Sequence, residues 1–445
     1  MATLRVREYE RLGCGAEFAP EKPQVTPVQR NALEHFSESY RRTRGVTVFQ
    51  NGPKNTLVTQ NFVGVINLGK HQIEVLPKIE GTDTEVRGNL MKMVAATLGL
   101  KLHADTLSQI DRNDQTILEL MIRLFCEELW QAVRRGIVRR YESHEANLVV
   151  LRGRLNVSQQ IRHNLVRPDR LHCTFDEFCD DNELNRVLKC ALRVVLRAAR
   201  TPSTVRSVSE LLFCFQDVAD VSPEALRWEK VGLDRTSDRY RPLVKLARLF
   251  IDGSSPDLIA GAGDGFAVLF DMNELFEEYV GRQARHVFGK QGFSVLLQGP
   301  RRHLAKAMKG SHAFQLRPDV VLSAGVVPQV VLDTKWKRLR DDAKHGAVSS
   351  ADMYQMYAYS HRYQVEEVVL LYPHHAGLGP WRARRAEYEL PGTGDGVALR
   401  RIVVATIDLT DLGTVRGQLQ QVLPKAVLQV ALCAGQSTST LSMVV

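Results

Sequence analysis

Two short apolar segments that each carry an aspartate at one end constrain the fold more than any other feature of this sequence. Asp319 precedes the first Val-Val-Leu run and Asp333 follows the second, with Ser323-Ala-Gly325 between them. Runs of β-branched residues separated by glycine predict two strands joined as a hairpin, which brings both carboxylates to one end of a sheet. Because strand side chains alternate with period two, Lys335 is expected on the same face as Asp333.

This grouping of two carboxylates and an ammonium is suited to the hydrolysis of a phosphodiester bond. Mg²⁺, or Mn²⁺ in its place, prefers oxygen ligands and needs only one or two carboxylates besides its waters. A lysine beside the ion helps to orient or deprotonate the attacking water and offsets negative charge on the phosphate. The alternative is a buried sheet edge with solvated charges, because short motifs also occur by chance.

A helix is expected before the hairpin, from Met272 to Lys290, where apolar residues recur at helical spacing. Glu277 lies beside the apolar face of this helix, whereas Glu278 lies on the far side and should be solvated. Glu277 is therefore the candidate for a third acidic metal ligand.

A second helix is expected after the hairpin, from Ser350 to Gln364. Asp352, Gln355 and Tyr359 share one face of it and are expected to point toward the carboxylates, so Gln355 is a candidate for holding the phosphate or a nucleobase. A half-buried aromatic packing helix explains the same pattern. With strands at Phe293–Leu297 and Val368–Tyr372, the order helix, strand, hairpin, helix, strand predicts a mixed α/β core.

Two motif halves in this region, Arg317-Pro318-Asp319 and Asp333-Thr334-Lys335, resemble those of the PD-(D/E)XK nuclease superfamily. The segment Gln355-Met-Tyr-Ala-Tyr359 is similar to the Gln-x-x-x-Tyr motif of the RecB-like branch. The resemblance implies that Asp319 and Asp333 bind Mg²⁺ and that Lys335 serves the hydrolytic water. It also implies an upstream helical glutamate, and Glu277 takes that position.

Four upstream segments in the same order resemble the McrC family, the nuclease subunit of McrBC-type restriction systems. They are Phe62-Val-Gly-Val-Ile, Ile73-Glu-Val-Leu-Pro-Lys78-Ile, Leu151-Arg-Gly-Arg-Leu and Asp181-Asn-Glu-Leu-Asn185-Arg. This resemblance implies an endonuclease that acts on DNA carrying modified bases such as 5-methylcytosine. It also implies a partner, a hexameric AAA+ GTPase of the McrB kind, whose hydrolysis the chain stimulates.

The overall charge and the missing motifs are compatible with that assignment. A formal charge of +9 favours a polyanionic partner such as DNA. The sequence contains no Gly-x-x-x-x-Gly-Lys-Ser/Thr segment, so a restriction function requires a separate motor. It has neither a signal-peptide core nor a membrane-spanning apolar stretch, so a cytoplasmic location without membrane contact is expected.

The organisation predicted from these patterns is a multidomain α/β chain. A small β-rich domain is expected over 1–101, a helical middle region over 102–255, and a PD-(D/E)XK nuclease domain with a C-terminal tail over 256–445. Helices are expected from Ile117 to Val138 and from Asn182 to Ala199.

The middle segment from Asn147 to Arg170 is open to two interpretations. It combines Leu148-Val-Val-Leu with several arginines, among them Arg154 and Arg162. In the McrC family such a segment is an arm that enters the pore of the GTPase hexamer. The alternative is a basic hairpin packed on its own helices.

Two other functions remain open from the sequence. One is an adaptor that mainly activates the motor and carries a weak or vestigial nuclease. The other is a repair or recombination nuclease on the same fold, resembling RecB-like exonucleases.

Overall fold

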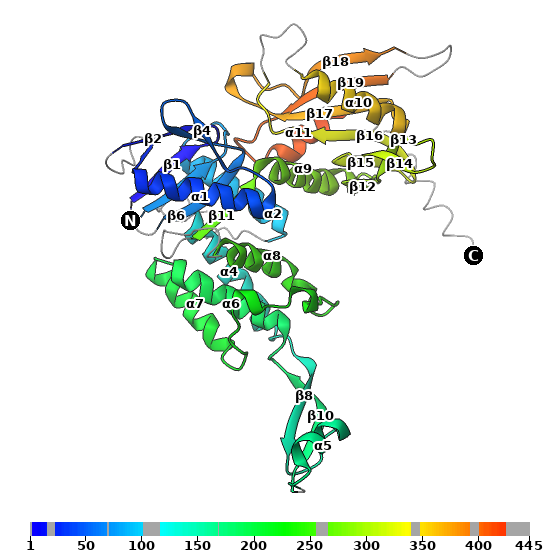
Figure 1. Ribbon diagram of the computed structural model, residues 1–445. Coiled ribbons are helices and arrows are strands. Elements are labelled where there is room, and N and C mark those ends of the chain that lie inside the picture. Colours follow the sequence, from blue (N-terminus) through cyan, green and yellow to red (C-terminus); the bar gives the residue numbers. More distant parts are fainter. Residues whose placement is uncertain are drawn as a thin grey trace, which may run out of the picture.

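The computed structural model describes residues 2–15, 23–68, 71–100, 116–167, 169–254, 266–339, 348–391 and 400–423. It confirms a multidomain α/β fold, with N-terminal sheets, a helical body that carries an arm, and a C-terminal mixed sheet (Figure 1). The predicted boundaries at 101–102 and 255–256 and most of the expected C-terminal tail lie outside the described residues.

The N-terminal part contains two four-stranded sheets, ordered β1-β7-β6-β11 and β3-β2-β5-β4. The strands are β1 (Ala2–Arg7), β2 (Arg11–Cys14), β3 (Gln24–Val25), β4 (Phe49–Gly52), β5 (Thr56–Thr59), β6 (Phe62–Leu68), β7 (His71–Leu76) and β11 (Phe266–Asp271). β11 follows the predicted boundary near residue 256, yet it pairs antiparallel with β6, from Phe266 opposite Asn67 to Asp271 opposite Phe62. The first sheet is therefore completed by a strand that the prediction had placed in the third domain.

Two helices, α1 (Pro27–Arg44) and α2 (Asp83–Leu98), lie in the part that was predicted to be rich in strands. Both begin with a capping box, in which a threonine at the N-cap and the residue three positions later exchange hydrogen bonds, Thr26 with Gln29 and Thr82 with Glu85. These signatures are visible in the sequence and identify both starts.

The helical body consists of α4 (Ile117–Arg134), α6 (Glu183–Ala198), α7 (Pro202–Cys214) and α8 (Arg241–Gly253), with short 3₁₀ turns η1 (Pro223–Ala225), η2 (Trp228–Lys230) and η3 (Asp238–Tyr240). α4 and α6 confirm the two long helices expected here. No described helix has both the length and the apolar character needed to cross a membrane.

The helical middle region is interrupted between α4 and α6, where the chain forms an arm. β8 (Arg140–Leu148) pairs antiparallel with β10 (Leu171–Cys179) over the full length of both strands. β9 (Arg154–Leu155) and α5 (Val157–Asn164) lie near its far end, and Figure 1 shows the arm extending away from the helical body. The segment is therefore a projection and does not pack on the body helices. Several apolar side chains there are more than half exposed, namely Val149, Val150, Leu151, Val157, Ile161, Leu165 and Val166.

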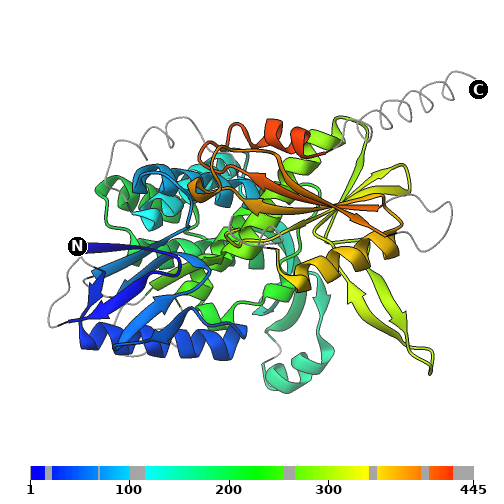
Figure 2. The same cartoon turned by 90° about the horizontal axis from the view of Figure 1, so that it is seen from above.

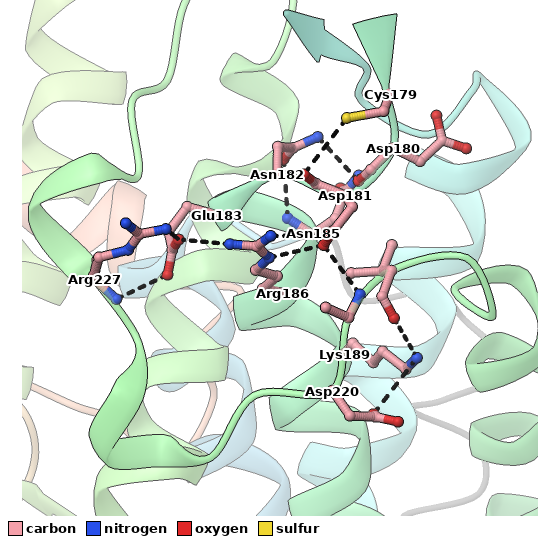
Figure 3. A network of polar contacts seen from close by, with 12 residues as sticks. Cys179, Asp180, Asp181, Asn182, Glu183, Asn185, Arg186, Lys189, Asp220 and Arg227 are labelled. Atoms are coloured by element: carbon pink, nitrogen blue, oxygen red, sulfur yellow. Dashed lines mark hydrogen bonds and ion pairs between the residues drawn. The ribbon is translucent and has the colours of Figure 1, made fainter. Parts of the chain in front are cut away.

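The base of the arm is fixed to α6 by a network of polar contacts around the Asp181–Arg186 segment (Figure 3). The Nδ2 atoms of Asn182 and Asn185 each donate to the carbonyl of Val138 at 2.8 Å, and Asn185 also donates to that of Asp180 at 2.7 Å. Arg186 donates two hydrogen bonds to the Asp181 carboxylate, at 2.7 and 2.8 Å. Because buried carbonyls need partners, these side chains hold the ends of β8 and β10 in one position on the body.

The C-terminal domain is a six-stranded mixed sheet, ordered β12-β15-β16-β17-β19-β18, with helices on both faces. Its elements are α9 (Met272–Gly289), β12 (Ser294–Leu297), β13 (Arg302–Lys306), β14 (His312–Leu316), β15 (Val320–Ala324), β16 (Val327–Thr334), α10 (Ser350–Tyr363), β17 (Glu367–Pro373), η5 (Ala376–Leu378), β18 (Arg384–Leu390), β19 (Arg400–Ile407) and α11 (Val415–Val422). α9 and α11 share a core with one face of the sheet, and α10 shares a core with the other. Both faces are covered, which explains why the central strands are continuous apolar runs.

The network at the base of the arm leads to a stability prediction. We expect Asn185→Ala to lower the free energy of unfolding by about 2 kcal/mol, because Asn185 is fully buried and serves two carbonyls. Amide hydrogen exchange should rise in β8 and β10, which thermal unfolding and exchange mass spectrometry would measure. Arg193→Ala on the same helix is the control, because the exposed Arg193–Asp220 pair contributes less than about 1 kcal/mol. Equal effects of the two variants would contradict a structural role for the network.

Candidate active site

The two aspartates lie at the same end of the β15–β16 hairpin, as predicted. Val320 pairs with Leu332 in this antiparallel ladder, and one further step along that register places Asp319 opposite Asp333. Oδ2 of Asp319 accepts hydrogen bonds from the backbone N–H and the hydroxyl of Thr334, both at 2.7 Å. Thr334, the middle residue of the second motif half, therefore fixes the carboxylate that belongs to the first.

Lys335 turns back toward Asp333, and its Nζ lies 2.5 Å from Oδ2 of that residue. Its backbone N–H donates to the carbonyl of Leu371 at 2.9 Å, which continues the parallel pairing of β16 with β17. The prediction that Lys335 and Asp333 share a face is confirmed. Burial by itself lowers the pKa of Lys335, but the carboxylates of Asp333 and Asp319 more than offset this, so the pKa is raised and the side chain stays an ammonium.

The pKa values of both aspartates at this end of the sheet are raised above their ordinary value. Burial raises the pKa of Asp333, and the negative charge of Asp319 raises it further. Burial also raises the pKa of Asp319, against the hydrogen bonds from Thr334. A cation bound between the two carboxylates would favour their ionised forms.

Glu277 on α9 faces this group, whereas Glu278 does not. Gln298 Nε2 donates to Oε1 of Glu277 at 2.9 Å, and burial, followed by the nearby charge of Asp319, raises the pKa of Glu277. Glu278 is exposed and forms an ion pair with Arg282 at 2.8 Å. The structure thus separates the two glutamates in the way the helical spacing predicted.

The α10 side chains reach the site through the backbone of the first motif half. The Tyr359 hydroxyl donates to the carbonyl of Arg317 at 3.0 Å, and Gln355 Nε2 donates to the Tyr359 oxygen at 2.9 Å. Among the described contacts, none joins Gln355 to a site carboxylate, so its place is behind Tyr359. Asp352, on the same face, instead pairs with Lys337 at 3.3 Å and accepts a hydrogen bond from Tyr372.

The donor set fits a hard divalent cation at Asp319 and Asp333. Oδ2 of Asp333 is buried and accepts no well-aligned hydrogen bond, so its contact is the ion pair with Lys335. Carboxylate oxygens are the ligands that Mg²⁺ and Mn²⁺ prefer, and two of them suffice when waters complete the shell. Across the described ranges no three carboxylates, imidazoles or thiolates are arranged to hold one ion. In this arrangement Glu277 is therefore a neighbour of the aspartate pair and does not complete a three-acid site.

One set of site contacts was missed from the sequence, because it comes from the N-terminal sheet. Glu8, after β1, accepts a hydrogen bond from Trp336 Nε1 at 2.8 Å, and Lys78, after β7, donates from Nζ to the Trp336 carbonyl at 3.2 Å. Trp336 directly follows Lys335 and its ring lies 5.2 Å from that of Phe276 on α9. The sequence drew attention to Lys78 as part of the Ile73–Ile79 segment, but nothing in that segment indicates that Lys78 contacts Trp336.

Glu8 gives this contact a measurable dependence on pH. Burial raises the pKa of Glu8 from 4.5 to about 7, although Lys78 opposes the shift. The folded protein therefore holds this proton more tightly than the unfolded chain, and stability is lost as pH rises from 4.5 through 7. The full difference is on the order of 3 kcal/mol at 1.36 kcal/mol per pKa unit.

We expect Glu8→Gln to become progressively more stable relative to the unmodified protein as pH rises from 5 to 8, because the variant has no carboxyl group to ionise. Thermal unfolding at several pH values measures the difference. Glu38→Gln, at an exposed position of α1, controls for the loss of a surface carboxylate. A Glu8→Gln difference that did not change with pH would show that Glu8 is not a buried acid.

Comparisons with known proteins agree with this architecture. A family model described as McrBC 5-methylcytosine restriction system component matches residues 57–373. No curated protein matches the chain. Two solved assemblies from Thermococcus gammatolerans are similar in structure. A refined half-complex of McrB AAA+ hexamers with bound McrC matches with a TM-score of 0.64 at 20% identity, covering 95% of this chain and 100% of that chain. The McrBC complex matches with a TM-score of 0.47 at 22% identity, covering 63% of this chain and 86% of that chain.

At this level of identity the structural match establishes a common fold only, and the family model carries the assignment. Its match extends from β5 to the end of β17, well over half of the chain, and includes the arm, Asp319, Asp333 and Lys335. The chain belongs to the family of McrBC 5-methylcytosine restriction system components.

Proposed function

We propose that this chain is the Mg²⁺-dependent (or Mn²⁺-dependent) DNA endonuclease subunit of its restriction system and acts with a separate AAA+ GTPase. The observation that carries the proposal is the meeting of Asp319, Asp333 and Lys335 at one end of a covered mixed sheet. These are the positions of the PD-(D/E)XK motif halves. Because clustered buried carboxylates are unfavourable without a counter-charge, a site of this kind is typical of functional residues.

The residues of the chain divide the work of hydrolysis among them. A divalent ion held by Asp319 and Asp333 would polarise the phosphate and lower the pKa of a bound water. Thr334 holds the Asp319 carboxylate in place. Lys335 stays cationic, so it orients the attacking water and offsets charge that develops on the phosphate. Glu277 lies at the border of the site, and its raised pKa suits it to take up a proton there or to hold a water by a hydrogen bond.

In the described contacts, Tyr359, with Gln355 behind it, reaches the backbone near Asp319 and not the carboxylates themselves. Tyr359, held by Gln355, fixes the carbonyl of Arg317 two residues before Asp319. Gln355 is therefore proposed to position the first motif half, in place of the direct phosphate contact expected from the sequence.

The arm is the part proposed to engage the GTPase. It projects from the body on a fixed base and exposes Val149, Val150 and Leu151 near its far end. Exposed apolar groups of this kind mark protein-binding surfaces. The similar assembly with bound McrC contains McrB AAA+ hexamers, which supports a motor partner of the same class for this chain.

Two alternatives make different predictions. An adaptor with a vestigial site would not need the buried acidic pair or its lysine, and these are intact here. A repair nuclease of the RecB-like type is favoured by the Gln355–Tyr359 pair, and it would degrade unmodified linear DNA without a motor.

We expect Asp333→Asn to lower cleavage of methylated DNA by more than about 100-fold, a larger loss than substitution of an outer-shell partner causes. The variant should keep its fold and its stimulation of GTP hydrolysis. The assay is plasmid cleavage with the partner motor and Mg²⁺, and EDTA should abolish activity in the unmodified protein. Glu278→Gln, which removes a solvated carboxylate one position from Glu277, should cleave normally. Normal cleavage by Asp333→Asn would establish the adaptor, and motor-free cleavage of unmodified ends would establish the repair nuclease.

We expect Arg162→Glu, in the exposed helix α5 of the arm, to reduce stimulation of the partner's GTP hydrolysis at least about 5-fold, the smaller end of typical coupling between two sites. Arg206→Glu on α7 is the matched charge reversal away from the arm and should leave stimulation unchanged. Initial rates of phosphate release measure the effect. If neither Arg162→Glu nor Arg154→Glu changed stimulation, the arm would not be the contact.

A further inference from the structure

The β13–β14 hairpin of the C-terminal domain forms no part of the six-stranded sheet. It is a separate two-stranded ribbon, in which Arg302 pairs with Leu316 and Lys306 with His312. Most of its side chains are exposed, including Leu304, Met308 and Phe314, which are each more than half exposed. In Figure 2 the ribbon extends from the domain, beyond the end of α10. An isolated two-stranded ribbon buries too little surface to contribute much to folding, so another role must account for it.

The ribbon leads directly into the candidate active site. β14 ends at Leu316, and only Arg317 and Pro318 separate it from Asp319. Its base is fastened to α10: the Arg302 guanidinium donates to the carbonyl of Arg362 at 2.6 Å, and the Arg362 Nε donates to that of His303 at 2.7 Å. Tyr363 also donates to the carbonyl of Pro300 at 2.5 Å. The ribbon is therefore held at its base beside the site, whereas the side chains of its tip are exposed.

The charge of this region has a single sign. From Tyr279 to Pro318 the sequence contains no aspartate or glutamate. Lys306 and Lys309 are exposed near the tip, and no ion pair of the described residues involves either of them. Positive side chains without acidic partners form a favourable surface for a polyanion, because their binding releases condensed counterions from it.

We propose that the β13–β14 hairpin is a DNA-binding ribbon that enters a groove of the duplex whose backbone is cut at Asp319 and Asp333. This inference rests on the proposed nuclease function and identifies how that site holds its substrate. A two-stranded ribbon fits the major groove of B-DNA, which is about 12 Å wide. Strands of this length extend about 17 Å, so the tip reaches phosphates about half a helical turn from the cut. Lys306 and Lys309 contact those phosphates, and Met308 and Phe314 lie against the groove.

The test is DNA binding by the full chain carrying Lys306→Ala and Lys309→Ala together. Fluorescence anisotropy of a labelled duplex of about 30 base pairs, in EDTA, measures affinity between 50 and 200 mM salt without cleavage. Loss of two phosphate contacts lowers the slope of log K against log salt by about 1.8. The unmodified protein should therefore lose about 12-fold more affinity over this range than the variant does. A variant with Arg193→Ala and Arg206→Ala removes the same charge from the helical body, and its slope should match that of the unmodified protein.

The outcomes separate this inference from the nuclease function itself. A reduced slope in the ribbon variant alone supports the ribbon. If the unmodified protein binds and cleaves DNA and both variants share its slope and affinity, the ribbon proposal fails and the nuclease function stands. If DNA binding is unchanged but binding of the GTPase is lost, the ribbon is a protein contact and the proposal fails. If the unmodified protein cleaves DNA with its motor but does not bind the duplex by itself, the ribbon proposal fails and the nuclease function stands.

Discussion

Asp333, which is buried, and Asp319, which is partly buried, lie opposite each other at one end of the sheet, and the contacts around them offset the repulsion between the two carboxylates. Burial raises the pKa values of both Asp333 and Asp319, and the negative charge of Asp319 raises that of Asp333 further, so the pair is unfavourable without a compensating charge. The ammonium of Lys335 supplies part of it, 2.5 Å from Asp333. The backbone N–H and the hydroxyl of Thr334 stabilise the Asp319 carboxylate further by donating hydrogen bonds to it. What remains is a demand for positive charge, which a divalent cation would satisfy.

The segment that carries Lys335 is held from two sides. On one side, the Lys335 N–H donates a hydrogen bond to the Leu371 carbonyl of β17. On the other side, Glu8 and Lys78, which follow strands of the N-terminal sheet, form hydrogen bonds with Trp336. The segment that follows β16 at the candidate site is thus supported by residues more than 250 positions earlier in the chain. Because the groups of a functional site must be held in a narrow range of positions, this support connects the N-terminal sheets to the candidate site.

The sequence predicted what local pattern determines and missed what depends on distant contacts. The hairpin of Asp319 and Asp333, the face of Lys335 and the distinction between Glu277 and Glu278 follow from periods of two and 3.6 residues. The arm was one of two interpretations, since a pattern of apolar residues and arginines does not say whether a hairpin packs or projects. Gln355 was placed on the correct face, but its pairing with Tyr359 depends on where the Arg317 carbonyl lies. The Glu8–Trp336 bond and the place of β11 in the first sheet had no signal within any window of sequence.

The membership of β11 in the N-terminal sheet has a consequence for modularity. The helical body and its arm are inserted between β7 and β11, and β11 passes directly into α9 through the capping residue Asp271, which also accepts a hydrogen bond from Asn61. A cut at residue 256 would separate β11 from its partner β6 and remove Glu8 and Lys78 from Trp336, so the C-terminal half is not a detachable unit. Since β11 also packs against α8, this one strand joins the inserted body, the first sheet and the helix that carries Glu277.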